Sequence, residues 1–195
     1  MLKVMKSGFL LAIAVVAMIA CSTSAFAQTV AERKAAMLQG LAELDCLVGD
    51  LKWDYDQALV HEKEEFEVLQ VRFNNARFNL LYVINPSIWE LRAAEKLLAV
   101  ADAIEEMETN GNVVNAKALV AALPGQISTL SGLINGWNGD AIEELQIRFL
   151  IEGLVQVLGG CQAIYDYFLD TTSIQEMLVE ATQAVVDFDD SVFNP

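Results

Sequence analysis

Apolar residues recur every three or four positions along the first half of the chain, which is the spacing of one helix face. This pattern predicts one long helix over residues 37–83. The spacing widens to eight residues between Ala58 and Phe66, where the charged run 61–65 interrupts the series. Such a stutter locally unwinds packed helices, so we expect a bend or a polar patch there. The predicted core positions are Leu41, Leu44, Val48, Leu51, Tyr55, Ala58, Phe66, Leu69, Phe73, Ala76, Leu80 and Val83.

A second, shorter helix follows Pro86, which ends the first helix because the residue before a proline is pushed out of the helical region. Ser87 and Glu90 form a capping box that begins this second helix. The turn at residues 110–112 ends it. Its predicted core positions are Leu91, Ala94, Leu98, Ala101 and Ile104.

The third helix is predicted over residues 113–134, with a kink or break at Pro124 and Gly125. A loop rich in glycine and asparagine follows, and the fourth helix is predicted over residues 141–169. Its core positions are expected to be Ile151, Leu154, Leu158, Cys161, Tyr165 and Phe168.

A last helix begins at the capping pair Ser173 and Glu176 and ends near Asp190. No stretch of the chain shows the alternating pattern typical of strands. We therefore predict an all-α helical bundle with one long N-terminal helix and about four shorter helices.

The first 27 residues have the composition of a bacterial secretory signal peptide. Lys3 and Lys6 precede an uncharged apolar stretch over residues 9–20, which is too short to span a membrane. A small-residue cleavage pattern follows and places the cut between Ala27 and Gln28. We therefore predict a cleaved signal over 1–27 and a single helical-bundle domain over 28–195, exported to the periplasm or the extracellular space.

An alternative cleavage site lies before Cys21. The residues around it resemble the lipobox of bacterial lipoproteins, although Met18 is an unusual first residue for that motif. Acylation of Cys21 would tether the same domain to a membrane. A membrane-tethered lipoprotein is therefore the alternative to a soluble exported product.

The chain is strongly acidic, with 12 basic and 27 acidic residues and a net charge of −15. Removal of the signal takes two basic residues and no acidic ones, which brings the net charge to −17. Such a field repels nucleic acids and anionic membrane surfaces, so we expect no nucleic-acid partner. Arg148 is the last basic residue, and the acidic C-terminal segment beyond it is predicted to be a solvated surface.

Two cysteines, Cys46 and Cys161, remain after the predicted cleavage. An exported protein meets an oxidising environment, so we expect these two cysteines to form a disulfide. Two buried free thiols are the alternative, because both cysteines have apolar neighbours in the sequence.

The sequence lacks the residue patterns of common catalytic and metal sites. A di-iron bundle needs Glu-x-x-His on two helices, but the chain has a single histidine, His61. The lone histidine also disfavours serine and cysteine nucleophile chemistry, and the acidic series at residues 187–192 lacks the glycine of an EF-hand. We assign no catalytic, cofactor-binding or metal-binding residue and predict that the protein is not an enzyme.

Residues 118–139 carry no charge. One side of this segment has large apolar residues and the other has small ones, which let helix backbones approach closely. Together with Gly153, Gly159 and Gly160, the small side predicts a tight hairpin buried in the core. A self-association surface and a membrane-entering segment are the alternatives. The large residues are Leu119, Leu123, Ile127, Leu130, Ile134 and Trp137, and the small ones are Ala118, Ala121, Gly125, Ser128 or Thr129, Gly132 and Gly136.

Trp137 lies in the loop after this segment. It is either an exposed aromatic anchor for a partner or a sugar, or it folds back onto the core. Trp137, Gly125, Gly132 and Gly136 are the candidate interaction residues.

The missing catalytic patterns favour an exported structural or protein-interaction subunit that self-associates through helical surfaces. Apolar residues outside the main seam of the long helix support this, since they need a second contact surface. The expected partner is a second copy of the chain or another exported protein. The alternatives are a binding module for a small apolar ligand or lipid, and a membrane-active helical protein that uses residues 118–139. The off-seam residues are Trp53, Val60, Val68, Val71 and Phe78.

Overall fold

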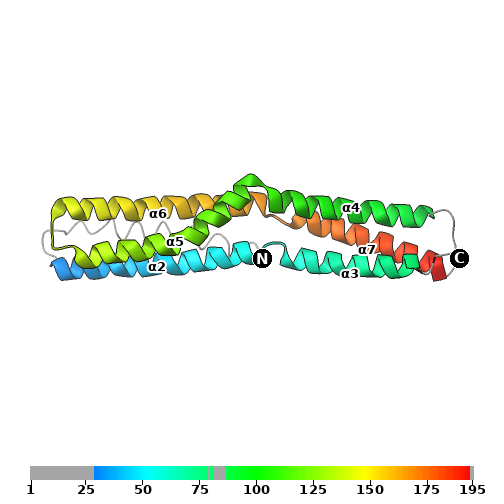
Figure 1. The fold of residues 1–195 in the computed structure, drawn as a ribbon, viewed down its shortest axis with the longest axis horizontal. Coiled ribbons are helices and arrows are strands. Elements are labelled where there is room, and N and C mark those ends of the chain that lie inside the picture. Colours follow the sequence, from blue (N-terminus) through cyan, green and yellow to red (C-terminus); the bar gives the residue numbers. More distant parts are fainter. Residues whose placement is uncertain (1–28, 79, 81–86, 194–195) are drawn as a thin grey trace. The chain divides into compact units, whose positions relative to one another are not determined.

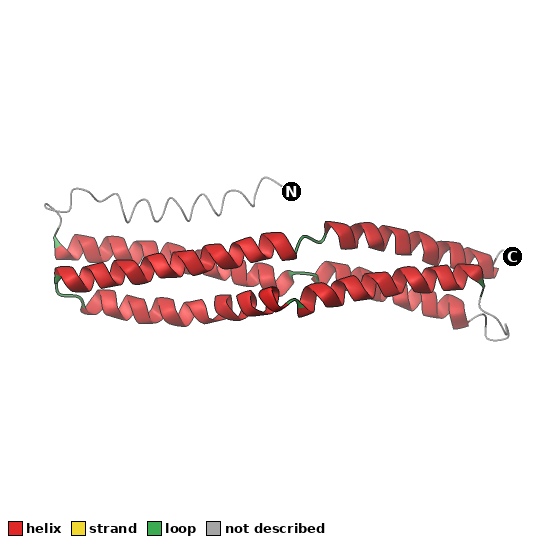
Figure 2. Ribbon diagram, turned by 90° about the horizontal axis from the view of Figure 1, so that it is seen from above, coloured by secondary structure: helices red, strands yellow, loops and turns green. Residues whose placement is uncertain are grey.

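The computed structural model describes residues 29–78, 80 and 87–193, and within them it contains helices and no strand. The all-α prediction is therefore confirmed. The described residues hold six helices, one more than the sequence predicts. They are α2 (Val30–Gln57), α3 (Val60–Phe78), α4 (Ile88–Thr109), α5 (Gly111–Gly136), α6 (Ala141–Phe168) and α7 (Thr172–Phe193) (Figures 1 and 2).

The chain divides into two compact units. Of the described residues, one unit comprises 29–56 and 115–165, and the other comprises 57–78, 80, 87–114 and 166–193. In the described residues, α2 and most of α5 and α6 form the first unit, and α3, α4 and α7 form the second. The single-domain organisation of residues 28–195 stays a prediction.

The core of the first unit is a seam on each of its three helices. Buried residues follow one another in steps of three and four, as the a and d positions of a heptad do. Polar contacts also join α2 to α6, since the Tyr55 hydroxyl donates to the Cys161 carbonyl at 2.8 Å and Arg33 pairs with Glu144. The seams are Met37, Leu41, Leu44, Val48, Leu51 and Tyr55 on α2, Ala116, Val120, Leu123, Ile127, Leu130 and Ile134 on α5, and Ile147, Ile151, Leu154, Leu158 and Cys161 on α6.

The second unit is built in the same way from α3, α4 and α7. The rings of Phe73 on α3 and Phe188 on α7 lie 5.4 Å apart, centroid to centroid. Ion pairs at the surface join α7 to its neighbours, with Arg72 to Asp189 at 2.8 Å. The seams are Leu69, Phe73 and Ala76 on α3, Ala93, Leu97, Val100 and Ile104 on α4, and Ile174, Leu178, Ala181, Val185 and Phe188 on α7.

The long N-terminal helix predicted from the sequence is interrupted at residues 58–59, so that α2 and α3 are separate helices. Leu59 has a φ of +65° and is buried. Leu59 follows the seam residue Tyr55 by four positions but belongs to the second unit. The interruption therefore lies close to where the chain passes from the first unit to the second. The charged run 61–65, where a bend or polar patch is expected, is itself helical.

Helix α5 starts earlier than predicted and continues through Pro124. Asn110 explains the early start, because its Oδ1 accepts hydrogen bonds from the amides of Asn112 and Val113 and so caps the helix. The capping prediction at Ser87 is confirmed, since its hydroxyl accepts from the Glu90 amide at 3.0 Å.

Candidate interaction site

From Ala118 onward, the surface of α5 combines an absence of charge with wide exposure. Its buried seam takes about two positions in seven, as in a coiled coil, and the other positions of residues 118–136 face outward or lie at the edge of the core. Leu119 and Leu133 are half-exposed. A helical segment that lacks charge and buries only one narrow stripe has apolar surface left to cover.

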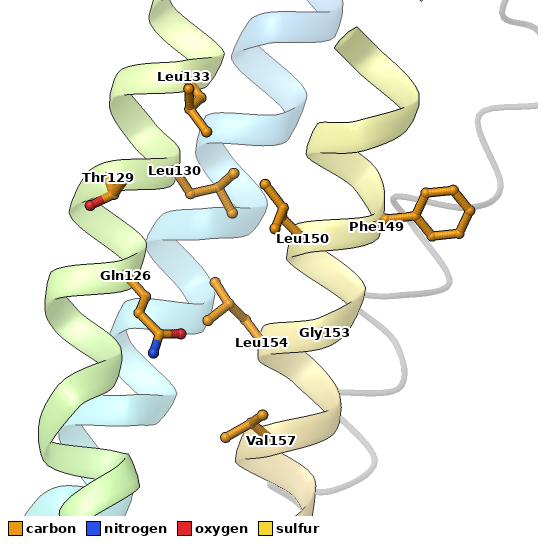
Figure 3. A pocket seen from close by; sticks show the side chains of 9 residues that line it. All are labelled: Gln126, Thr129, Leu130, Leu133, Phe149, Leu150, Gly153, Leu154 and Val157. Carbon is orange, nitrogen blue, oxygen red and sulfur yellow. The ribbon is translucent and has the colours of Figure 1, made fainter. Parts of the chain in front are cut away.

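An open groove runs between α5 and α6 within the first unit. Its volume is about 440 Å³, and none of the residues that line it is charged. In Figure 3, Leu133 of α5 and Leu150, Leu154 and Val157 of α6 point into the space between the helices, whereas Phe149 points away from α5. The α5–α6 groove is lined by Gln126, Thr129, Leu130, Leu133, Phe149, Leu150, Gly153, Leu154 and Val157.

The tight hairpin predicted from the small residues does not form within the chain. Gly125, Gly132, Gly136, Gly153 and Gly160 each have open space where a Cβ would stand, with no neighbouring atom within 4 Å. A close approach of two backbones would leave no such space. The close packing predicted for these small residues is therefore wrong, because the core side of α5 is its large apolar seam and its glycines lie outside it.

The candidate interaction residues are placed differently from one another. Gly125, Gly132 and Gly136 are exposed on α5 and do not line the groove, whereas Gly153 of α6 does. The heptad spacing of Leu119, Gln126 and Leu133 is the sequence signal that marks the groove side of α5.

Trp137 folds back onto the core and is 2% exposed, so it is not a surface anchor. Its indole nitrogen donates to the Asp140 carbonyl at 2.6 Å, which satisfies the polar end of the ring. The Arg33 guanidinium lies 5.0 Å from the ring centroid, within range of a cation–π contact.

A buried carboxylate next to Trp137 was missed by the sequence analysis. The Glu144 carboxylate forms ion pairs with the Arg33 guanidinium at 2.5 Å and with the Arg148 guanidinium at 2.8 Å. Its position three residues before Ile147 continues the α6 seam, which is the signal that would have found it. Because two cations surround this one carboxylate, the cluster is a structural link between α2 and α6.

The second unit contains a comparable buried carboxylate, Glu62 on α3. Its Oε1 accepts a hydrogen bond from Gln175 of α7 at 2.9 Å. Burial alone would raise the pKa of Glu62, but hydrogen bonds from Gln175 and Thr171 outweigh it and leave the pKa below its ordinary value. Glu62 thus supplies a polar contact inside the seam, within the charged run that the sequence marks as a stutter.

The predicted disulfide between Cys46 and Cys161 is absent from the structure. Cys161 belongs to the α6 seam, and burial raises the pKa of its thiol. Cys46 is exposed on α2. It follows the seam residue Leu44 by two positions, about 200° around the helix, and so points away from the core.

Across residues 29–78, 80 and 87–193, no three His, Cys, Asp or Glu side chains lie together in a way that would hold a metal ion. The imidazole of His61 is exposed and lies 3.3 Å from Glu65. The predicted cleavage site at Ala27 and Gln28, and the alternative at Cys21, lie outside the described residues.

Two helical stretches, Gly111–Gly136 and Ala141–Val192, are long and apolar enough to cross a membrane. Only 28% of each apolar window is buried. Core helices of soluble proteins and signal sequences meet the same criteria of length and composition.

No family model matches the chain, and no curated protein and no solved structure is similar to it.

Proposed function

We propose that the protein is an exported, non-enzymatic structural or protein-interaction subunit that associates with itself through its helical surfaces. Export is proposed from the N-terminal segment, with Cys21 acylation as the membrane-tethered alternative. The expected partner is another copy of the chain or a second exported protein.

One observation carries this proposal: α5 has no charged residue from Ala118 onward and leaves most of its surface uncovered. In a chain with a net charge of −15, a charge-free face is the place where association costs least electrostatically. Exposed apolar side chains of this size usually mark an interaction surface.

Sedimentation velocity tests the proposal. The chain is expressed with its N-terminal segment in a bacterial host, purified from the exported fraction, and measured over a hundredfold range of concentration. We expect a concentration-dependent shift from monomer to a larger species. A single monomeric species over the whole range would overturn the proposal. The intact mass of the same sample identifies the cleavage site and any acyl group on Cys21.

The second candidate is a binding module for a small apolar ligand or lipid. The α5–α6 groove favours it, because about 440 Å³ lies within the range of small-molecule sites and its lining is mostly apolar, with Gln126 and Thr129 as polar contacts. Native mass spectrometry of protein from its producing cells would detect a carried ligand as added mass.

A membrane-active protein is the third candidate. The length and apolar character of α5 favour it, whereas the net negative charge opposes approach to anionic bilayers. Release of a trapped dye from liposomes by micromolar protein would support this candidate.

A further inference from the structure

The α5–α6 groove has rows of large residues beside rows of small ones. On α5, Leu119, Gln126 and Leu133 recur every seven residues, so they share one face along the helix. Leu150 and Val157 recur in the same way on α6. The groove lining contains Gln126, Leu133, Leu150 and Val157 from these rows. These side chains form projecting knobs on both walls.

The small residues repeat with the same period. Ala122, Thr129 and Gly136 are seven apart on α5, and Gly153 and Gly160 are seven apart on α6. Gly136, Gly153 and Gly160 have no atom within 4 Å of a Cβ position. Each of these three glycines therefore leaves open space, a hole, beside a large residue of its own helix, and Gly153 lines the groove itself.

We propose that the occupant of the α5–α6 groove is the same groove of a second copy of this chain, related by a two-fold axis. A surface that carries both knobs and holes is complementary to itself, as a two-fold interface requires. In this dimer, Leu133 and Leu150 of one copy enter the space beside Thr129 and Gly153 of the other.

The charge distribution disfavours a basic partner at the groove and allows a second copy of this acidic chain to approach. Between Leu145 and Cys161, α6 has only Arg148 and Glu152 as charged residues, and neither lines the groove. Residues 118–139 add none. The groove therefore offers a basic partner no anionic contact, while two acidic copies can meet there with little like-charge repulsion.

The groove glycine provides the sharpest test. In Gly153→Leu, the new side chain meets no atom of its own chain at Cβ but occupies the groove that the second copy needs. We expect a higher melting temperature, because glycine is a poor residue inside a helix. We also expect association to weaken by at least about tenfold, since overpacking disrupts a fitted interface.

The matched control is Gly49→Leu. Gly49 is exposed on α2, has no atom within 4 Å of its Cβ position, and does not line the groove. Gly49→Leu should also raise the melting temperature but leave association unchanged. A second pair, Leu150→Asp in the groove against Leu98→Asp on α4, replaces exposed leucines of similar accessibility and should weaken association only in the first case.

This inference rests on the proposed self-association, and the outcomes separate the two. A wild-type chain that stays monomeric overturns both. A wild-type chain that associates while Gly153→Leu and Leu150→Asp associate equally well overturns only the assignment of the interface. A monomer that carries a lipid, lost in Gly153→Leu, assigns the groove to that ligand instead.

Discussion

Two carboxylates occupy core positions that residue type alone would reserve for apolar side chains. Glu62 is 5% exposed and is held by hydrogen bonds, and Glu144 is enclosed by two arginines. A buried charge persists only where it is paired in this way. Both residues therefore link helices that are distant in the sequence.

The stability of the second unit should depend on the ionisation of Glu62. Its pKa in the folded chain is lowered from 4.5, so the native state favours the charged form. The resulting stability is present above about pH 4.5 and is lost as the pH falls through the lowered pKa. Urea unfolding at pH values from neutral to acidic should show a smaller acid loss for Glu62→Gln than for wild type. The control is Glu180→Gln, whose exposed carboxyl is screened by solvent.

Removal of the Glu144 carboxylate should be costly, because it leaves Arg33 and Arg148 without their shared partner. We expect Glu144→Ala to lower the free energy of unfolding by about 1.5–3 kcal/mol, measured by urea denaturation. Glu143→Ala, at the neighbouring exposed position, should cost less than about 1 kcal/mol. Equal effects of the two substitutions would show that the arginines contribute little.

At the scale of the helix, spacing identified most of the buried seam positions of α2, α5 and α6, although Tyr165 and Phe168 of α6 are only half-buried and Leu119 of α5 is exposed. It failed on α4, where Leu91 and Leu98 are exposed and the seam runs through Leu97 and Val100 instead. The reason is physical: α4 has two neighbouring apolar stripes, and only contact with α3 and α7 selects one of them. Spacing alone contains no information about the packing partner.

The sequence marked the uncharged segment that forms one wall of the groove, but none of the four predicted interaction residues lines the groove. The absence of charge marked residues 118–139 as unusual. The small residues of α5 were expected to pack against the glycines of α6. However, Gly132 of α5 and Gly153 of α6 both face open space. Composition shows that a helix has apolar surface, but whether the same chain covers that surface depends on how many helices surround it.

Substitution by alanine should change the free energy of unfolding in opposite directions at Gly132 and Gly139. Gly132 lies inside a helix with space around its Cβ position, so Gly132→Ala should stabilise the protein by about 0.5–1 kcal/mol. Gly139 has a φ of +107°, and a Cβ there would lie 2.9 Å from Cγ2 of Val30. Gly139→Ala should therefore destabilise by more than about 1 kcal/mol. Urea unfolding of both variants measures the difference, and effects of the same sign would contradict it.

At the scale of the molecule, the acidic C-terminal segment is less isolated than its sequence indicates. Helix α7 contains no basic residue, but Arg72 pairs with Asp189 and Lys96 pairs with Glu180. Basic residues of α3 and α4 thus neutralise part of its charge. In the proposed dimer, the remaining acidic surface repels a second copy, whereas the uncharged α5–α6 groove does not.

The response to salt should reveal which force holds the copies together. Two copies that each carry a net charge of −15 repel each other. Raising the salt concentration from 0.01 M to 1 M shortens the range of that repulsion from about 30 Å to about 3 Å. An apolar contact through the α5–α6 groove does not depend on ion pairs, so added salt should strengthen association. Sedimentation velocity at several salt concentrations measures this, with Gly153→Leu as the variant that should gain little. Dissociation on addition of salt would mean that ion pairs, and therefore a different surface, join the copies.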